Sequence, residues 1–207
     1  MRKLVLRTAI AVIFAPTLAF AQAPTPAETA AALAVCNTIP LRQIEIRRGE
    51  ELDACWNAGL AALDAAGTLT VAEQEAVGMA FAGVLREAAP GPLPFGTIVP
   101  AVQVLSELLA ISAYRECWTR IERVSTIEGC SATVRIVTIA AQAIPDGNIE
   151  GVANNICIAS QARPAWQPVV LAIVDELIAR AATGTDPVMR LPIARVAEVR
   201  ATCGIVG

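Results

Sequence analysis

Apolar residues recur every three or four positions along most of this chain, which is the spacing of helices that each bury one face. The clearest stretch spans residues 50–66 and ends at Gly67, a residue typical of helix C-caps. Its apolar face is formed by Leu52, Cys55, Trp56, Leu60 and Leu63. The pattern predicts an amphipathic helix that packs against a core.

The same spacing predicts further helices on both sides of this stretch. Thr70-x-x-Glu73 has the form of a capping box and opens the next helix, in which Gly78 and Gly83 allow a neighbour to approach closely. The other predicted helices cover residues 28–37, 41–48, 101–124, 131–143, 148–162, 166–182 and about 186–203. Residues 24–27 are predicted to be a tail, and residues 126–129 a turn. The β-branched residues between Thr133 and Ile139 leave a strand as an alternative there.

One segment interrupts the helical pattern. Residues 89–100 read APGPLPFGTIVP, and their four prolines and two glycines exclude a regular helix. This linker, taken as residues 90–100, separates a helical piece at 27–89 from a longer piece at 101–204. Because the first piece is small, we expect both to share one core, giving a single all-α domain over residues 22–207.

A sequence repeat occupies the second piece. Residues 138–153 and 157–172 agree at six of sixteen positions, including Pro145 and Pro164, each of which follows an apolar run. A blurred third copy reaches residue 182. One short helix cannot bury its apolar face alone, so stacked neighbours must cover it. We interpret the repeat as a helical hairpin duplicated once, with a short solenoid-like stack as the alternative.

The N-terminal segment has the pattern of a secretory signal peptide. Arg2, Lys3 and Arg7 precede an apolar run, and Ala19-Phe20-Ala21 matches a small-x-small cleavage site. A signal peptide at residues 1–21 would leave 13 arginines, no lysine and 19 acidic residues, a formal charge of −6. That balance argues against nucleic acid as a partner. No later segment offers eighteen uninterrupted apolar residues, so no transmembrane span is expected after signal cleavage.

Six cysteines follow the predicted signal peptide. An even number in an exported chain favours disulfides over free thiols or a metal site. Fifteen pairings of six cysteines exist, and we predict the one that joins sequence neighbours. The predicted bonds are Cys36–Cys55, Cys117–Cys130 and Cys157–Cys203.

The residue types present exclude many reaction classes. The chain has no histidine, so it has no Ser-His-Asp or Cys-His nucleophile and no histidine metal ligand. Without a lysine in the mature chain, Schiff-base and P-loop chemistry are also absent. Acid/base catalysis would fall to carboxylates that lie close in sequence, which we interpret as solvated helix faces. They are Glu50, Glu51 and Asp53; Glu73 and Glu75; and Asp175 and Glu176.

Two other features are candidate binding elements. Residues 146–151 match the opening of an EF-hand calcium loop, but Cys157 stands where the bidentate glutamate should be, so we interpret them as a turn. Trp166 is the candidate contact residue, with a hydrophobic staple at a helix start as the alternative interpretation. We therefore predict no catalytic, cofactor-binding or metal-binding residue.

These observations predict an all-α, disulfide-stapled helical bundle with a C-terminal set of helical hairpins. We expect an exported bacterial protein, periplasmic or secreted, that is not an enzyme and acts through a protein partner or self-association as a structural or interaction component. A carrier of a lipid or other small apolar ligand is the alternative, since helical bundles can enclose a cavity. A carboxylate-based hydrolase ranks last.

Overall fold

A computed structural model describes residues 25–39, 50–89, 91, 99–117, 125–144, 163, 165–186 and 188–189. Every regular element in these ranges is helical, which confirms the predicted all-α class. The elements are α1 (Pro26–Leu33), η1 (Ala34–Thr38), α2 (Glu50–Asp64), η2 (Ala66–Thr68), α3 (Val71–Ala88), α4 (Pro100–Cys117), α5 (Ile127–Ala141) and α7 (Gln167–Thr183). None of these helices is long and apolar enough to cross a membrane.

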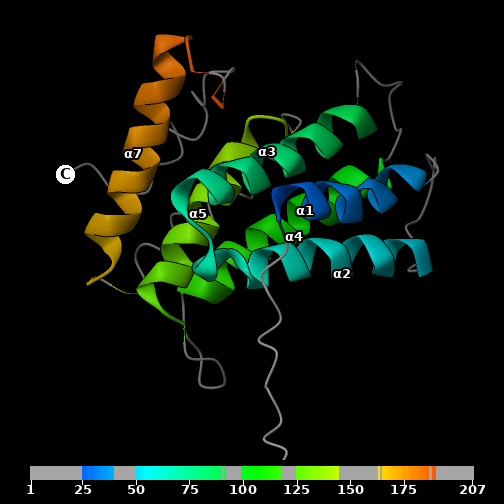
Figure 1. The fold of residues 1–207 in the computed structure, drawn as a ribbon, viewed down its shortest axis with the longest axis horizontal. Coiled ribbons are helices and arrows are strands. Elements are labelled where there is room, and N and C mark those ends of the chain that lie inside the picture. Colours follow the sequence, from blue (N-terminus) through cyan, green and yellow to red (C-terminus); the bar gives the residue numbers. More distant parts are fainter. Residues whose placement is uncertain are drawn as a thin grey trace, which may run out of the picture.

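The central element is α5. It packs against α3, α4, α7 and the short helix η2, and residues 132–142 are all buried. A helix that is buried on every side has no polar face, which explains why residues 132–141 are apolar or β-branched apart from Arg135. The structure therefore selects the helix over the strand alternative at Thr133–Ile139. In Figure 1, α7 stands at a steep angle to the other labelled helices, on the far side of α5 from α2.

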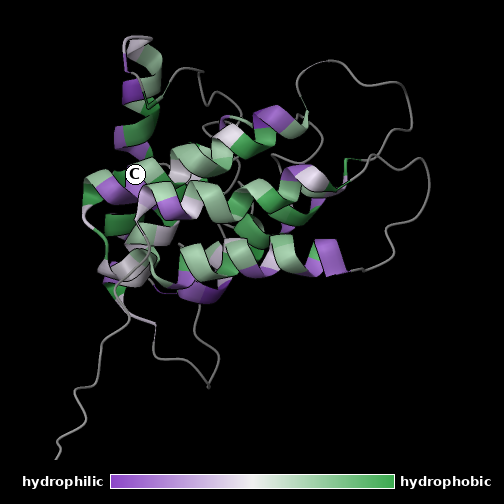
Figure 2. Cartoon of the chain, turned by 45° about the vertical axis from the view of Figure 1, so that its right-hand side comes forward, coloured by the Kyte–Doolittle hydropathy of each residue, from purple (hydrophilic) through white to green (hydrophobic). Residues whose placement is uncertain are grey.

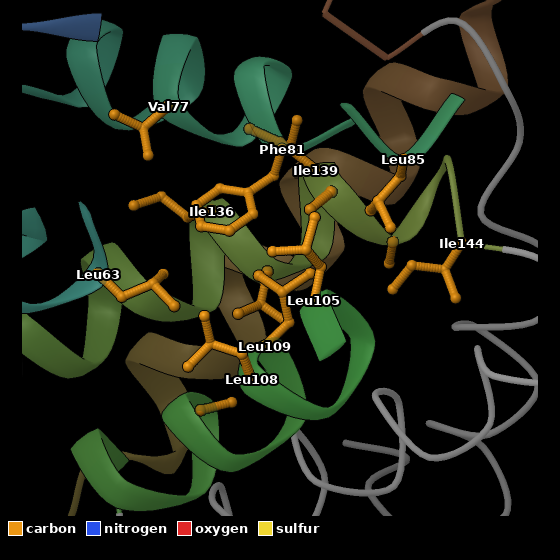
Figure 3. Close-up of a cluster of buried hydrophobic side chains, with 14 of the residues drawn as sticks. Leu63, Val77, Phe81, Leu85, Leu105, Leu108, Leu109, Ile136, Ile139 and Ile144 are labelled. Atoms are coloured by element: carbon orange, nitrogen blue, oxygen red, sulfur yellow. The ribbon is translucent and has the colours of Figure 1, made fainter. Parts of the chain in front are cut away.

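The core is one contiguous cluster with contributions from both sides of the 90–100 segment. Side chains from α2, α3, α4 and α5 converge in it, among them Leu63, Phe81, Leu105 and Ile136 (Figure 3). Polar residues concentrate on helix ends and outer faces, while hydrophobic residues gather where the helices face one another (Figure 2). Helices that precede and follow the Pro-rich segment thus bury their apolar faces against each other.

Two glycines permit the closest helix contacts. A Cβ built on Gly78 of α3 would lie 2.9 Å from the Cβ of Ile139 in α5, so only a glycine fits without displacement. A Cβ on Gly59 of α2 would collide with the Leu108 side chain of α4. The prediction of close approach is correct for Gly78 and wrong for Gly83, where a Cβ would meet nothing within 4 Å.

Two disulfides tie neighbouring helices together. Cys36 in η1 is bonded to Cys55 in α2, and Cys117 at the end of α4 is bonded to Cys130 in the first turn of α5. Both are among the three predicted pairings, and none of the described cysteines is free. The third predicted bond, Cys157–Cys203, lies outside the described residues.

Several predicted boundaries need correction. α1 begins at Pro26, inside the predicted tail, because Thr25 and Glu28 form a capping box and proline is favoured at the first helical position. α5 begins at Ile127 instead of residue 131, because the Thr126 side chain accepts a hydrogen bond from the Gly129 N–H. Gly67 does not cap α2 but lies in η2, where a Cβ would sit 3.1 Å from the Gly129 Cα.

Other predicted boundaries agree with the structure. The Thr70–Glu73 capping box is present at the start of α3, and Gly184 ends α7 with a φ of 66°. The remaining predictions lie outside the described residues. They concern the signal peptide at 1–21, the helices at 41–48, 148–162 and 186–203, the linker residues 92–98 and the loop at 146–151.

Candidate functional site

An open groove runs along the first half of α5, between the start of α3 and the start of α7. Its volume is about 370 Å³, at the lower end of the range for ligand-binding sites. The floor is one face of α5, the first wall comes from η2 and α3, and the second wall comes from α7. The lining residues are Gly67, Leu69, Val71, Gln74, Ile127, Glu128, Ser131, Arg135, Val169 and Ile173.

The apolar walls of the groove reach the surface. Val71 is 53% exposed and Val169 is 39% exposed, and these two are the exposed large hydrophobic residues of the described chain. A single exposed valine needs no explanation, but both lie on opposite walls of the same groove. Because both valines border one groove, this groove is the candidate binding surface of the described chain.

Local sequence features hold the walls in place. The Thr70 capping box fixes the first turn of α3, which carries Val71 and Gln74. The close contact between Gly67 and Gly129 brings η2 against the start of α5. Pro168 stands in the first turn of α7, where its missing N–H costs nothing, and Val169 follows it directly. The groove therefore begins at the first turns of all three helices and extends along α5 to Arg135.

A buried arginine closes one end of the groove. Arg135 is only 7% exposed, although the neighbouring residues of α5 are apolar or hydroxylated. Its Nη1 donates to Glu176 Oε1 at 3.4 Å and lies 3.6 Å from Glu75 Oε1. These two carboxylates, from α7 and α3, compensate a charge that would otherwise be costly to bury.

A second arginine extends this ion cluster to the end of α7. Arg180 donates from Nη1 and Nη2 to the two oxygens of Glu75, at 2.6 and 3.2 Å, and its Nε donates to Asp186. The Arg180 hydrogen bond lowers the pKa of Asp186, and the Val188 and Met189 N–H groups, which donate to the same side chain, act in the same direction. The cluster therefore fastens α7 and the buried Met189 onto α3 and α5.

The carboxylates predicted as possible acid/base groups differ in their surroundings. Glu50, Glu51 and Asp53 are exposed on the first turn of α2. Glu75 and Glu176 come from two separate predicted groups, and the arginines bring them together. The i,i+4 spacing of Glu176 and Arg180 favours an ion pair, and the pair is present at 3.4 Å. The Glu75–Arg180 contact joins residues 105 apart, and no local sequence pattern indicates it.

The convergence of Glu75 and Glu176 does not resemble a hydrolytic pair. Such a reaction needs one carboxyl able to donate a proton beside the substrate and a second as base or nucleophile. Here both carboxylates are held by Arg135 and Arg180, and neither lines the groove. The described residues also contain no group of three or more potential metal ligands.

Trp166, the candidate contact residue, lies half-buried against the core just before α7. The guanidinium of Arg163 sits 4.0 Å from the centre of its ring, a cation–π contact. Trp166 does not line the groove. The predicted contact residue thus lies three positions before Val169, which does line the groove. A lone exposed valine has no distinguishing pattern in the sequence.

Comparison with known proteins adds no functional assignment. No family model matches the chain, and no curated protein or solved structure matches it either. The role of the groove therefore depends on its own geometry and chemistry.

Proposed function

We propose that this chain is an exported, non-enzymatic bacterial protein that binds a protein partner in the groove between α3, α5 and α7. It would act as a structural or interaction component of the periplasm, the envelope or the exterior. The observation that carries this proposal is the placement of both exposed valines, Val71 and Val169, on facing walls of one open groove. An exposed apolar surface of this kind is stabilised when a partner covers it.

The openness of the groove favours a protein partner over a carried lipid. Sites for small ligands usually bury most of the ligand surface. Here the two valines remain about half exposed, at 53% and 39%, so an acyl chain in the groove would stay in contact with water. Between α2, α3, α4 and α5 lies a cluster of buried hydrophobic side chains (Figure 3).

Export is supported by two independent features. The first is the signal-like segment at residues 1–21. The second is the pair of disulfides, Cys36–Cys55 and Cys117–Cys130, because such bonds persist in oxidising compartments. Periplasmic or secreted placement is part of the proposal.

A display selection tests the proposed function. The oxidised protein, from residue 22 onward, is immobilised and used to select from a random peptide library. We expect enriched peptides whose binding is lost in the double variant Val71→Asp and Val169→Asp. They should still bind Ala61→Asp, a matched change at an exposed position of α2 outside the groove. Enrichment that is equal on all three proteins, or native mass spectra with a bound lipid displaced by the groove variant, would contradict the proposal.

A further inference from the structure

The two ends of the groove floor differ in charge. Glu128 lies in the first turn of α5, is exposed, and forms no hydrogen bond or ion pair with the residues that the structure describes. Arg135 follows seven residues later on the same lining face. At 1.5 Å per residue, the two positions are about 10 Å apart along the helix axis. The apolar walls lie between them.

Two nitrogens of the Arg135 guanidinium, Nε and Nη2, take no part in its contacts with the two glutamates. Its contacts with Glu75 and Glu176 both use Nη1. Within the described ranges, Nε and Nη2 have no hydrogen-bond partner. The residue is more than nine-tenths buried and lines the groove. A ligand that brings an oxygen to this point can accept from these guanidinium donors, and hydrogen bonds to charged groups are stronger than neutral ones.

The local charge balance selects the kind of acceptor. The groups that line the groove or contact Arg135 include three carboxylates, those of Glu75, Glu128 and Glu176. They outnumber the two arginines, Arg135 and Arg180. A fatty-acid carboxylate or a phosphate would therefore enter a region that is already acidic. A neutral carbonyl oxygen can accept from Arg135 without that repulsion.

Resting on the proposed function, we infer that the groove binds an apolar peptide segment that carries a lysine or arginine next to its apolar side chains. The basic side chain pairs with Glu128, the apolar side chains lie between Val71 and Val169, and a backbone carbonyl accepts from Arg135. Three residues of extended peptide span about 10 Å, which matches the separation of the two polar ends. The partner is thus a protein with an exposed basic and apolar segment.

Binding measurements on groove variants test this inference. A fluorescein-labelled synthetic copy of the best peptide from the selection is titrated against the folded, oxidised protein and followed by fluorescence polarisation. Glu128→Gln should weaken binding about three-fold and remove most of its salt dependence, as expected for an exposed ion pair. Glu107→Gln, which removes an exposed carboxylate from α4, is the matched control and should bind like the wild type.

Arg135 is tested with two variants, because removing its charge also affects the ion cluster. Arg135→Lys keeps a cation near Glu75 and Glu176 but removes the Nε and Nη2 donors, and binding should weaken about ten-fold. Arg135→Met should lose binding to a similar extent, with circular dichroism reporting whether it is folded. Equal binding by wild type and Arg135→Lys would overturn the role of this residue.

The failures of the two proposals are distinguishable. Peptides that need Val71 and Val169 but lack a basic residue, or that bind Glu128→Gln as well as wild type, would overturn this inference and leave a protein-binding groove. No groove-dependent peptide at all would overturn both proposals. Decanoate that binds wild type and is excluded by Val169→Asp would replace both with the carrier function.

Discussion

At the scale of single residues, the fit between α3 and α5 depends on the missing side chain of Gly78. The two helices are so close there that a Cβ would also lie 3.2 Å from the Ile136 carbonyl oxygen. Neither backbone nor a β-carbon can rotate out of the way. Gly83, five residues along the same helix, has open space instead. One helix thus contains a glycine that packing requires and another that packing does not require.

The two glycines should respond oppositely to the same substitution. Gly78→Ala is expected to destabilise the protein by about 1–3 kcal/mol, because the helices must separate. Gly83→Ala should stabilise it by about 0.5–1 kcal/mol through higher helix propensity. Urea denaturation followed by circular dichroism measures both. A Gly78→Ala variant as stable as Gly83→Ala would show that α3 and α5 are farther apart than described.

At the scale of elements, the periodicity of apolar residues is enough to place α2, α3, α4 and α7, because one buried face repeats every three to four residues. For α5, which is buried on every side, the sequence leaves a strand as an alternative. Helix ends were less predictable. The start of α1 follows the same Thr-x-x-Glu pattern as the start of α3, so Thr25 and Glu28 indicate a helix start where the composition of residues 24–27 suggests a tail. Gly67 was expected to cap α2 but lies in η2, where it contacts Gly129. This tertiary contact outweighs the preference of glycine for a C-cap.

The attachment of α7 is the element-scale feature with a clear pH dependence. The pKa of Asp186 is lowered in the folded protein, chiefly by the Arg180 hydrogen bond. The resulting stability is fully present above the ordinary aspartate pKa, near about 3.9, and is lost as the pH falls below it through the lowered value. Acid should therefore lower the free energy of unfolding, because protonation of Asp186 removes the ion pair that attaches α7 and the 188–189 segment.

Asp186→Asn tests this dependence. The variant lacks the ion pair at every pH, so its free energy of unfolding should be lower than that of wild type at pH 6, with the difference shrinking toward pH 2.5. Glu107→Gln, at an exposed position of α4, is the control and should follow the wild-type curve. A difference between Asp186→Asn and wild type that stays constant over this pH range would show that Asp186 does not pair with Arg180 in solution.

At the scale of the whole molecule, the sequence predicted the fold class and two disulfides but not the groove. Neighbouring cysteines pair because short connections keep consecutive helices adjacent. The groove instead requires η2 and α3, α5 and α7 to meet at particular angles, and its lining combines residues as distant as Gly67 and Ile173. Glu75 and Arg180 are likewise joined only by the fold. Charge counts and helical spacing do not indicate which residues far apart in the sequence come into contact.

The disulfides should be protected as long as the fold is intact. Cys36, Cys55, Cys117 and Cys130 are at most 1% exposed, so dithiothreitol cannot reach their sulfurs in the native state. Native protein treated with dithiothreitol and iodoacetamide should therefore leave these four residues unalkylated, and the same treatment in urea should modify them. Peptide mass spectrometry identifies the modified cysteines. Alkylation of Cys36 or Cys117 without urea would contradict the described burial.

Removing either disulfide measures its contribution to the free energy of unfolding. The loops closed by Cys36–Cys55 and Cys117–Cys130 are similar in size, with sequence separations of 19 and 13. The entropy of the unfolded chain predicts that each bond contributes about 3 kcal/mol. Replacing either pair with alanine should lower the free energy of unfolding by that amount, measured by urea denaturation. A loss confined to one pair would show that the other closes a loop that is already restricted when unfolded.

The shared core makes a final prediction about cooperativity. Leu63 and Phe81 precede the 90–100 segment, and Leu105 and Ile136 follow it, yet all four belong to one buried cluster. Neither set can remain folded after the other has separated, because each would expose the apolar face that the other covers. In a Trp118→Phe background, tryptophan fluorescence reports Trp56 in α2 and Trp166 beside α7. It should therefore change together with far-ultraviolet circular dichroism in one urea transition. Adding Trp166→Phe leaves only Trp56, adding Trp56→Phe leaves only Trp166, and both variants should give the same midpoint. Separate midpoints would mean that α7 unfolds independently of the other helices. The groove would then lose one wall whenever α7 unfolds.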